Sequence, residues 1–182
     1  MVRILLLYSS TDGQTLAISR RLVEIVEAHG HAVSLQAIDD AEGLDLGTYD
    51  RILIGARIRY GRHHAWVLDF VRRHRIELDA KPCGFFSVSV VARKPNRDTP
   101  ETNPYLRRFL RQTGWRPRHL AVFAGRIDYP RYGMIDRLVI RLIMALTHGP
   151  TDPSATVEFT DWSAVEAFGH RFAADVSDVA KK

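Results

Sequence analysis

Short apolar runs of strand length alternate with amphipathic helical patterns along most of this 182-residue chain. Continuous apolar strands that are separated by helices favour a parallel sheet with helices on both faces. Apolar residues make up 46% of the chain, enough to form the core of a single domain spanning 1–182. The expected strands are 3–8, 32–37, 51–56, 84–90 and 119–124, and the expected helices are 15–29, 64–74, 102–113 and one that begins near Thr160 or Asp161.

One segment interrupts this alternation, because 125–159 separates the last expected strand from the last expected helix. A structureless connection of that length is uncommon inside a compact domain. Its middle is strongly apolar and carries Arg137 and Arg141 one helical turn apart, so we predict an inserted helix and a short returning strand at 155–159. The insertion is expected at about 125–155. Its pattern leaves open whether it contacts a membrane, the substrate, the domain core or a second subunit of a homo-oligomer.

The positive charge is concentrated in the middle of the chain. Residues 50–118 hold sixteen Arg and Lys against six Asp and Glu, whereas the net charge of the whole chain is only +5. Such a field favours anionic partners: phosphate, carboxylate-bearing ligands, acidic lipid or nucleic acid. The basic residues of 93–111 are spread over a loop and a helix without interleaved exposed aromatic residues, so we expect no nucleic-acid partner.

The first 50 residues contain a candidate phosphate-binding loop between the strand 3–8 and the helix 15–29. The amino end of a helix offers unpaired N–H groups and a positive dipole, and hydroxyls and a glycine there can form a phosphate cradle. Ordinary helix capping would use the same residue types. The loop lacks the lysine of ATP-binding loops and the three-glycine spacing of dinucleotide sites, which disfavours ATP and NAD. Its residues are Ser10, Thr11, Asp12, Gly13, Gln14 and Thr15.

This loop resembles the phosphate loop of flavodoxins, whose pattern is Ser/Thr-x-Thr-Gly-x-Thr. Ser10, Gly13 and Thr15 match the pattern, whereas Asp12 replaces a threonine. The resemblance implies a flavodoxin-like α/β fold, with a five-stranded parallel sheet in the order 2-1-3-4-5, helices on both faces, and the long insertion near the fifth strand. It also implies noncovalently bound FMN, with the flavin ring held by the loops after the third and fourth strands, at the switch point of the sheet.

Five further strings narrow the resemblance. The chain carries IRYG, VARKP, NPY…FL, WRP and YPRY…D in this order, and over essentially its whole length it is similar to the menaquinone-dependent protoporphyrinogen oxidases of bacteria. That resemblance implies an FMN-dependent oxidation of protoporphyrinogen IX to protoporphyrin IX in haem biosynthesis, in three two-electron steps, with electrons passed to menaquinone or ubiquinone. It further implies a peripheral location on the cytoplasmic face of the bacterial inner membrane. A flavodoxin-type electron carrier or an FMN quinone reductase is the alternative.

The two loops expected to hold the flavin ring supply the remaining cofactor candidates. Tyr60 is expected to stack on the flavin, because a flat aromatic ring suits a flat ligand. Small residues in the second loop would let backbone amides approach the flavin edge. The candidates after the strand 51–56 are Ala56, Arg57, Ile58, Tyr60 and Gly61, and those from the end of the strand 84–90 onward are Ser87, Val88, Ser89, Val90, Ala92 and Arg93.

The substrate implied by the resemblance carries propionates, which guanidinium and ammonium groups bind well. Arg59, Arg93, Lys94 and Arg131 are therefore the substrate-binding candidates, although charged loop residues are commonly only solvated. No catalytic residue follows from the sequence, and the candidates are His64 and Arg59. His63 and His64 follow the strand 51–56, where a titratable group close to the flavin could accept a proton. Helix-start histidines that face solvent are the alternative.

We expect no metal site among the remaining titratable residues. His63, His64, His74 and Cys83 have no recognised ligand spacing. Cys83 is the single cysteine and stands at the entrance of the strand 84–90, so we expect a buried, unreactive thiol.

Overall fold

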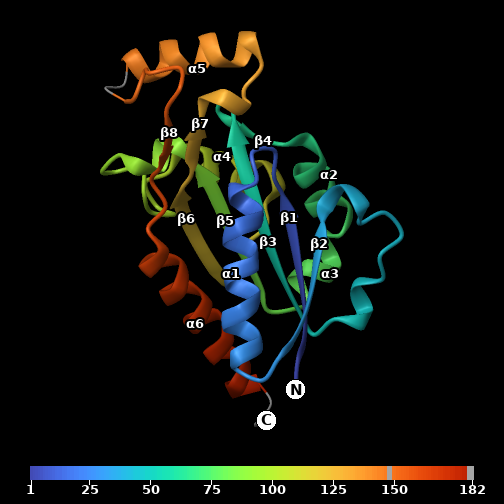
Figure 1. Ribbon diagram of the computed structural model, residues 1–182. Helices are drawn as coiled ribbons and strands as arrows, with labels where there is room; N and C mark the ends of the chain where they lie inside the picture. The colour runs from blue at the N-terminus through green and yellow to red at the C-terminus, as the bar shows by residue number, and fades with distance from the viewer. Residues whose placement is uncertain (147–148, 180–182) are drawn as a thin grey trace.

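The computed structural model describes residues 1–146 and 149–179, with the side chains of 176–179 not described. Five parallel strands form one sheet in the order β2-β1-β3-β5-β6, which is the predicted 2-1-3-4-5 order (Figure 1). The strands are β1 (Arg3–Ser9), β2 (Ala32–Ala37), β3 (Arg51–Arg59), β4 (Arg62–His63), β5 (Cys83–Ser89), β6 (His119–Ala124), β7 (Arg126–Asp128) and β8 (Thr156–Glu158). The helices are α1 (Gln14–Ala28), α2 (Ala65–Arg73), α3 (Arg75–Asp79), α4 (Pro104–Thr113), α5 (Met134–Leu146) and α6 (Trp162–Val179).

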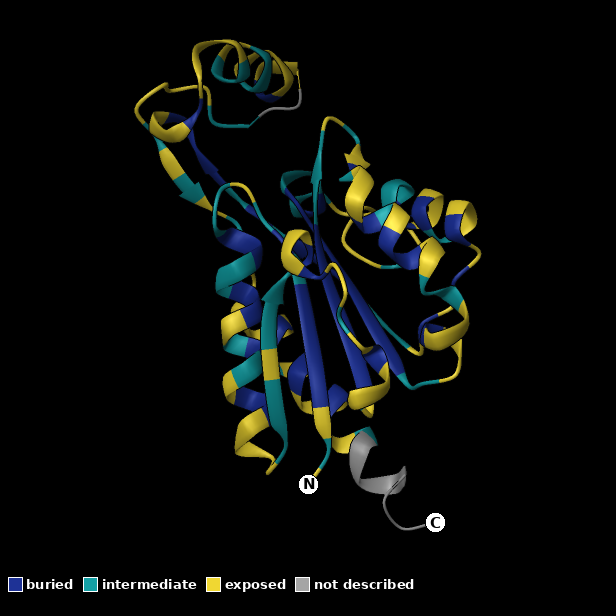
Figure 2. Cartoon of the chain, turned by 90° about the vertical axis from the view of Figure 1, so that its right-hand side faces the viewer, coloured by how far each residue is buried: buried dark blue, intermediate teal, exposed yellow. Residues whose placement is uncertain are grey.

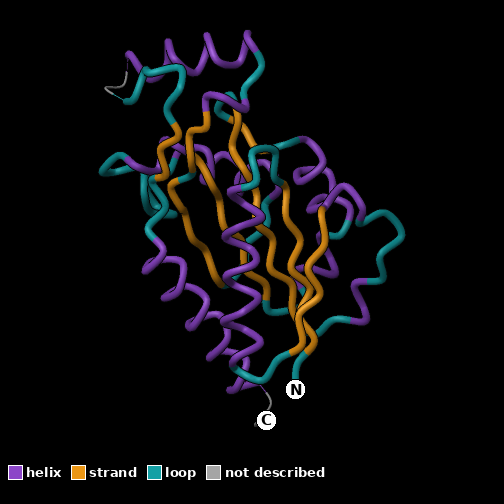
Figure 3. The backbone as a smooth tube through the Cα atoms, viewed as in Figure 1, coloured by secondary structure: helices purple, strands orange, loops and turns teal. Residues whose placement is uncertain are grey.

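Helices cover both faces of the sheet, and Figure 3 shows the strands between these two helical layers. Alternate residues of a strand point to opposite faces, so the sheet contributes to two separate cores. Leu5, Leu7 and Phe85 face a core built with α2 and α4, whereas Leu6 and Phe86 face a core built with α1 and α6. The central strands are therefore buried on both sides, which explains their continuous apolar sequences (Figure 2).

The helix ends follow their local sequence. Asn103 caps α4 because its side-chain oxygen accepts hydrogen bonds from the backbone N–H of Tyr105 and Leu106, both at 3.1 Å. Asp161 caps α6 in the predicted way, since its carboxylate accepts the N–H of Ala164 at 3.1 Å. Gly30 follows the end of α1 and has a φ of 81°, a left-handed conformation that glycine adopts without strain.

Close approach of two central strands depends on Gly55 of β3. A Cβ at this position would lie only 2.1 Å from the ring of Phe86 on β5. The absence of a side chain lets the Phe86 ring lie across β3 and complete the core under α6. Gly55 is thus a packing requirement of the strand pair that leads into the functional site.

The predicted insertion is present and begins with a strand that the sequence did not reveal. β7 pairs antiparallel with β8, with Arg126 opposite Glu158 and Asp128 opposite Thr156. The returning strand predicted at 155–159 is β8, and the predicted helix is α5, which lies beyond the carboxyl edge of the sheet (Figure 1). No helix among the described residues is long and apolar enough to cross a membrane.

Two further elements were missed. The expected strand 51–56 continues to Arg59 and turns back as β4, where Ile58 pairs with His63 and Arg59 with Arg62. The short helix α3 follows directly after α2, which ends at Arg73. Both elements are too short to show a periodic pattern in the sequence.

Candidate active site at the carboxyl edge of the sheet

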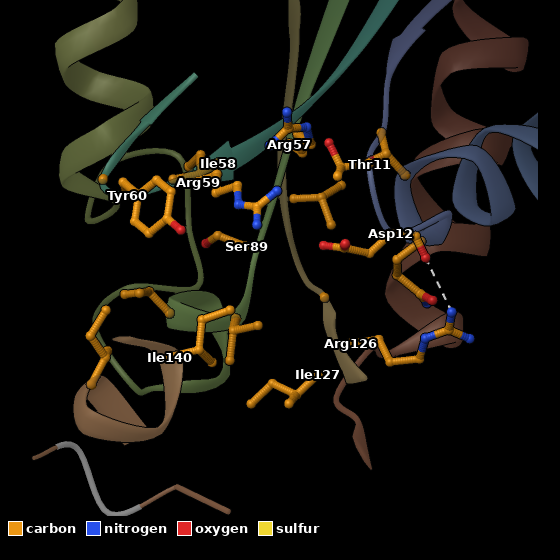
Figure 4. Close-up of a pocket in the computed structure, with 18 of the residues that line it drawn as sticks. Thr11, Asp12, Arg57, Ile58, Arg59, Tyr60, Ser89, Arg126, Ile127 and Ile140 are labelled. Carbon is orange, nitrogen blue, oxygen red and sulfur yellow. Dashed lines mark hydrogen bonds between the residues drawn. The ribbon is translucent and has the colours of Figure 1, made fainter. Parts of the chain in front are cut away.

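A cavity of about 420 Å³ opens at the carboxyl ends of β1, β3 and β5 and is closed on the far side by the insertion. This is the switch point of the strand order, where open α/β sheets bind their ligands. Figure 4 shows Arg59 and Tyr60 on one side, Thr11 and Asp12 on the opposite side, and Ile127 and Ile140 along a third. The lining residues are Ser10, Thr11, Asp12, Gln14, Thr15, Arg57, Ile58, Arg59, Tyr60, Gly61, Val88, Ser89, Val90, Val91, Tyr105, Gly125, Arg126, Ile127, Tyr132, Ile140, Ile143 and Met144.

The phosphate loop has the geometry of an anion cradle. Gly13 is the N-cap of α1 with φ 82°, a left-handed conformation that glycine adopts without strain. Ser10 Oγ accepts the N–H of Gly13 at 3.1 Å, which holds the turn in place. Among the described residues no side chain caps the amino end of α1. The positive end of this helix is thus free to face an anion in the cavity.

The loop after β3 is a two-residue turn. Tyr60 and Gly61 both have positive φ, 51° and 73°, and they connect the paired residues Arg59 and Arg62. Two positive φ values are typical of a type I′ hairpin turn, whose twist matches that of the flanking strands. This turn places Tyr60 at the cavity wall with 53% of its surface exposed, available to a flat ligand.

Three arginines line the cavity and come from different elements: Arg57 and Arg59 from β3, and Arg126 from β7. Burial, and secondly the neighbouring charge of Arg59, lower the pKa of the Arg57 guanidinium. Arg126 Nη2 donates to the backbone oxygen of Asp12 at 3.1 Å, so this residue joins the insertion to the phosphate loop. The concentrated positive charge favours a ligand with more than one anionic group.

Unpartnered polar atoms show that the cavity suits a polar ligand. Arg57 Nε, Ser89 Oγ and Arg126 Nε are buried and have no hydrogen-bond partner among the described residues. Buried polar groups without partners cost free energy, so three of them around one cavity indicate a missing partner. The donor set fits FMN: the α1 terminus and the loop hydroxyls would hold its phosphate, and Ser89 with nearby backbone groups would face the ring.

A buried histidine lies beneath the hairpin. His63 Nε2 is 2.5 Å from Ser87 Oγ, and the ring packs against Phe85 and Phe109. Burial lowers the pKa of His63 to about 3, so the ring is neutral at physiological pH. Ser87 lies below the cavity wall and holds this ring. The pair therefore supports the β3–β4 hairpin from inside.

Cys83 matches its prediction of a buried thiol. Its Sγ donates to the backbone oxygen of Leu78 at 3.2 Å, and burial raises the pKa of the thiol to about 12. A thiol of that pKa stays protonated at neutral pH and is a poor nucleophile.

The structure places the predicted loop residues of all three segments around one cavity. Thirteen of them line it, namely Ser10, Thr11, Asp12, Gln14, Thr15, Arg57, Ile58, Arg59, Tyr60, Gly61, Val88, Ser89 and Val90. Their binding of FMN stays a prediction, since their position alone does not test it. Gly13 adjoins the cavity as the N-cap of α1.

Several predicted residues lie outside the cavity lining. Ala56 and Ser87 are buried within the strands, and Ala92 is buried in the turn after β5. Arg93 packs over the ring of Phe159 at 5.6 Å and donates to the backbone oxygen of Val90, whereas Lys94 lies half-buried beside it. Binding of the substrate by these two cations stays a prediction, since neither residue lines the cavity.

Arg131 and His64 also lie at the margin. Arg131 is near the phosphate loop, since its Nη1 would be 4.0 Å from a Cβ on Gly13, and its Nε is 3.9 Å from the Asp128 carboxylate. His64 caps α2, where its Nδ1 accepts the N–H of Trp66 at 3.4 Å. This geometry favours the alternative reading of a helix-start histidine over a catalytic one.

Residues of the insertion and of α4 complete the cavity, and the sequence did not identify them. Arg126 had no signal because β7 has only three residues. The apolar residues of α5 gave no clear signal, because the same sequence pattern fits a helix that packs against the domain core. The unpredicted lining residues are Val91, Tyr105, Gly125, Arg126, Ile127, Tyr132, Ile140, Ile143 and Met144.

Comparisons with known proteins agree with this architecture. A family model described as "Flavodoxin domain" matches residues 5–154. The solution structure of two-electron reduced Megasphaera elsdenii flavodoxin superposes with a TM-score of 0.59 at 15% identity, over 94% of this chain and 98% of that one. At this identity the likeness shows the fold alone. The match confirms the predicted fold and, through the family, the predicted FMN cofactor.

Closer relatives share the insertion region as well. The chain is 41% identical to the protoporphyrinogen IX dehydrogenase (quinone) of Escherichia coli strain K12, over 94% of this chain and 95% of the relative. It is also 41% identical to the protein of the same name from Leishmania major, over 93% of this chain and 74% of the relative. Such identity over nearly the whole length includes both the sheet edge and the insertion. The chain therefore belongs to the flavodoxin family, within its protoporphyrinogen IX dehydrogenase (quinone) group.

Proposed function

We propose that this protein oxidises protoporphyrinogen IX to protoporphyrin IX with FMN as its cofactor and a quinone, menaquinone or ubiquinone, as electron acceptor. The observation that carries the proposal is the 41% identity, over 94% of the chain, to a protoporphyrinogen IX dehydrogenase (quinone). Three two-electron steps remove six hydrogen atoms from the macrocycle, and three quinones become quinols. Bound FMN supplies the two-electron redox chemistry of each step.

The cavity divides into parts that suit this reaction. The α1 terminus and the Ser10–Thr15 loop would hold the phosphate of FMN. The apolar lining from Ile127, Ile140 and Met144 would exclude water and contact an apolar macrocycle. Arg59 points into the cavity near this apolar side and would bind a propionate (Figure 4). The protein thus orients the substrate and the cofactor, while no side chain in the lining is needed as a nucleophile.

The absorption spectrum of the purified protein is the first test. A yellow protein that releases free FMN on acid treatment supports a flavin site, and a protein that binds no FMN contradicts the proposal. Porphyrin fluorescence should then appear when protoporphyrinogen IX is added anaerobically with a soluble menaquinone analogue. A simple electron carrier or an FMN quinone reductase would bind FMN but produce no such fluorescence.

Arg59 allows a test of substrate binding that is independent of the cofactor. Arg59→Ala should lower the apparent affinity for protoporphyrinogen IX at unchanged FMN content, because one guanidinium partner of a propionate is lost. Arg97→Ala is a matched control, since Arg97 is exposed and does not line the cavity. Equal affinities for both variants would contradict the role of Arg59.

We further propose that the insertion contacts the lipid membrane from which the quinone is taken. The outer face of α5 exposes Met134, Ile135, Leu138, Leu142 and Leu146, by between 61% and 87%. An exposed apolar helix face is typical of proteins that lie on a membrane. The cytoplasmic side of this membrane stays a prediction from the family resemblance.

Vesicle flotation tests this contact. With phosphatidylcholine–phosphatidylglycerol vesicles, the double variant Leu138→Ser/Leu142→Ser should bind several-fold less than the wild type. Ile76→Ser is the control, because Ile76 is 87% exposed on α3 far from the insertion. Unchanged binding would contradict the proposal. A wild-type dimer that this double variant dissociates would instead make the same face a subunit interface.

A further inference from the structure

The helix α5 carries one acidic side chain toward the cavity. Asp136 lies in its first turn, and its two carboxylate oxygens contact two different groups of the β3–β4 hairpin. Oδ2 accepts from Arg59 Nη2, and Oδ1 accepts from the hydroxyl of Tyr60. Both donors line the cavity. A carboxylate of the protein itself therefore occupies the donors on this wall.

This contact differs from the other polar contacts of α5. Arg137 Nε donates to the backbone oxygen of Tyr129 at 3.1 Å, and Arg141 Nε donates to that of Thr151 at 2.9 Å. Both acceptors belong to the insertion, so these bonds fix its internal shape. Among the described residues, Asp136 makes the side-chain hydrogen bonds from α5 to the sheet domain.

The donor pair has the shape of a carboxylate subsite. A guanidinium N–H and a phenol O–H reach separate oxygens of one carboxylate, which is the arrangement that charge-assisted recognition of a carboxylate requires. Arg57 and Arg126 add positive charge to the same cavity. A ligand carboxylate that entered here would find the same two donors and would compete with Asp136 for them.

The contact of Asp136 with Arg59 is weak enough for a ligand carboxylate to displace it. The side chains of Arg59 and Asp136 are 27% and 31% exposed, so water screens their attraction. Partly exposed ion pairs of this kind contribute little to stability, and displacing one changes an affinity by roughly fivefold at most. An apolar ligand without a carboxylate gains nothing from these two donors and leaves Asp136 in contact with them.

We propose that Asp136 is a specificity-determining residue that occupies a substrate-carboxylate subsite formed by Arg59 and Tyr60 until a propionate of the substrate replaces it. Replacement releases the amino end of α5 from the hairpin and lets the apolar residues of α5 settle on the macrocycle. The ligand class is an apolar molecule with at least one carboxylate. This inference rests on the proposed function, because that function supplies the propionates.

Equilibrium titration with a redox-inert ligand tests the competition without turnover. Protoporphyrin IX carries the two propionates, and its dimethyl ester lacks the carboxylates but keeps the ring. Binding of each to FMN-loaded protein is followed by porphyrin fluorescence at fixed ionic strength. Asp136→Asn should tighten binding of the diacid by roughly two- to fivefold and leave the ester unchanged, because only the diacid competes with Asp136.

Asp152→Asn is the matched control. Asp152 is an exposed aspartate of the same insertion that bonds to Ser154, so the variant changes the net charge equally without touching the cavity. It should leave both affinities unchanged. Arg59→Gln should bring the affinity for the diacid down to that for the ester, and adding Asp136→Asn to it should then have no effect.

Three results would overturn the inference. They are weaker or unchanged diacid binding in Asp136→Asn, equal tightening of diacid and ester, and equal tightening in Asp152→Asn. Each leaves the proposed function intact, provided that wild-type protein still binds the diacid and retains FMN. Failure of wild-type protein to bind either porphyrin would instead reject the proposed function, and this inference with it.

Discussion

The sheet edge and the insertion form opposite walls of one cavity, yet they are built in different ways. All seven residues of β5 are buried. In α5 the only buried residue is Met144, and its apolar residues face either the cavity or solvent. The packed wall can hold a cofactor in a fixed position, whereas the exposed wall can adapt to a large, flat substrate. We therefore expect cofactor binding and substrate choice to be separable.

Removing the insertion gives the largest expected effect. Replacing 130–147 by a short Gly-Ser linker should leave FMN bound and lower porphyrinogen turnover by at least about a hundredfold, because one whole wall of the cavity is lost. FMN content and initial rates of fluorescence increase measure the two effects. Loss of FMN would show that the walls are not independent, and retained turnover would refute a role of the insertion in the reaction.

The next largest effect is the pH dependence of stability that His63 causes, and it should not depend on the insertion. Its pKa is about 3 in the folded protein and 6.5 in an exposed histidine. Folding favours the neutral ring, so this contribution to stability is complete above pH 6.5 and is lost as the pH falls toward 3. We expect the free energy of unfolding to drop by about 2 kcal/mol between pH 7 and pH 5 from this residue.

Urea denaturation at both pH values measures this drop. The double variant His63→Phe/Ser87→Ala removes both polar partners, so its stability should fall less over the same range. The difference between the two proteins isolates the histidine from all carboxylates. The protein without 130–147 should behave like the wild type, and identical pH slopes for wild type and the double variant would contradict the low pKa.

Two glycines, one on each wall, allow a smaller and matched comparison. Gly13→Ala forces a side chain into a left-handed conformation at φ 82°, which costs about 1–2 kcal/mol and should weaken FMN binding roughly tenfold. Gly133→Ala, before α5, meets nothing within 4 Å and should leave FMN affinity unchanged. Fluorescence titration of the FMN-free proteins measures both affinities. Equal effects would mean that the loop conformation at Gly13 does not matter for the phosphate.

The smallest expected effect concerns a single hydroxyl. Ser89→Ala removes a buried group without a partner among the described residues, so FMN affinity should fall about fivefold while the FMN-free protein is no less stable. Thr113→Ala is the control, for which we expect lower stability and unchanged FMN affinity. Its hydroxyl donates to Phe109 at 3.0 Å, so its loss should lower stability and leave FMN affinity unchanged. Reduced stability of FMN-free Ser89→Ala would show that the hydroxyl has a partner within the protein.

Sequence reasoning was accurate where burial on both faces imposes a pattern. The five parallel strands were predicted because continuous apolar runs favour a sheet buried on both faces, and their order followed from the resemblance to flavodoxins. The candidate phosphate loop was proposed because a glycine and hydroxyls stand between a strand and a helix, in a pattern that resembles the loop of flavodoxins. In this loop the tight backbone turn and the expected phosphate both favour glycine and hydroxyl residues.

The rest depended on contacts between distant segments. Asp136 reaches Arg59 across 77 positions of the chain, and one aspartate within an apolar helix gives no sign of its partner. Arg126 stands in a strand of three residues, too short for any periodicity. The packing of Arg93 over the ring of Phe159 gave no signal either, because the direction in which a loop turns its side chains depends on tertiary packing.

The β7–β8 ladder has a consequence for how this enzyme group could arise. Because Arg126 lies opposite Glu158, the segment between them leaves and re-enters the fold at neighbouring points. A stretch with adjacent ends can be gained, exchanged or lost in one genetic event without moving any other element. Transfer of residues 126–158 into an ordinary flavodoxin, followed by a measurement of porphyrin binding, would show whether this segment is enough for porphyrin recognition.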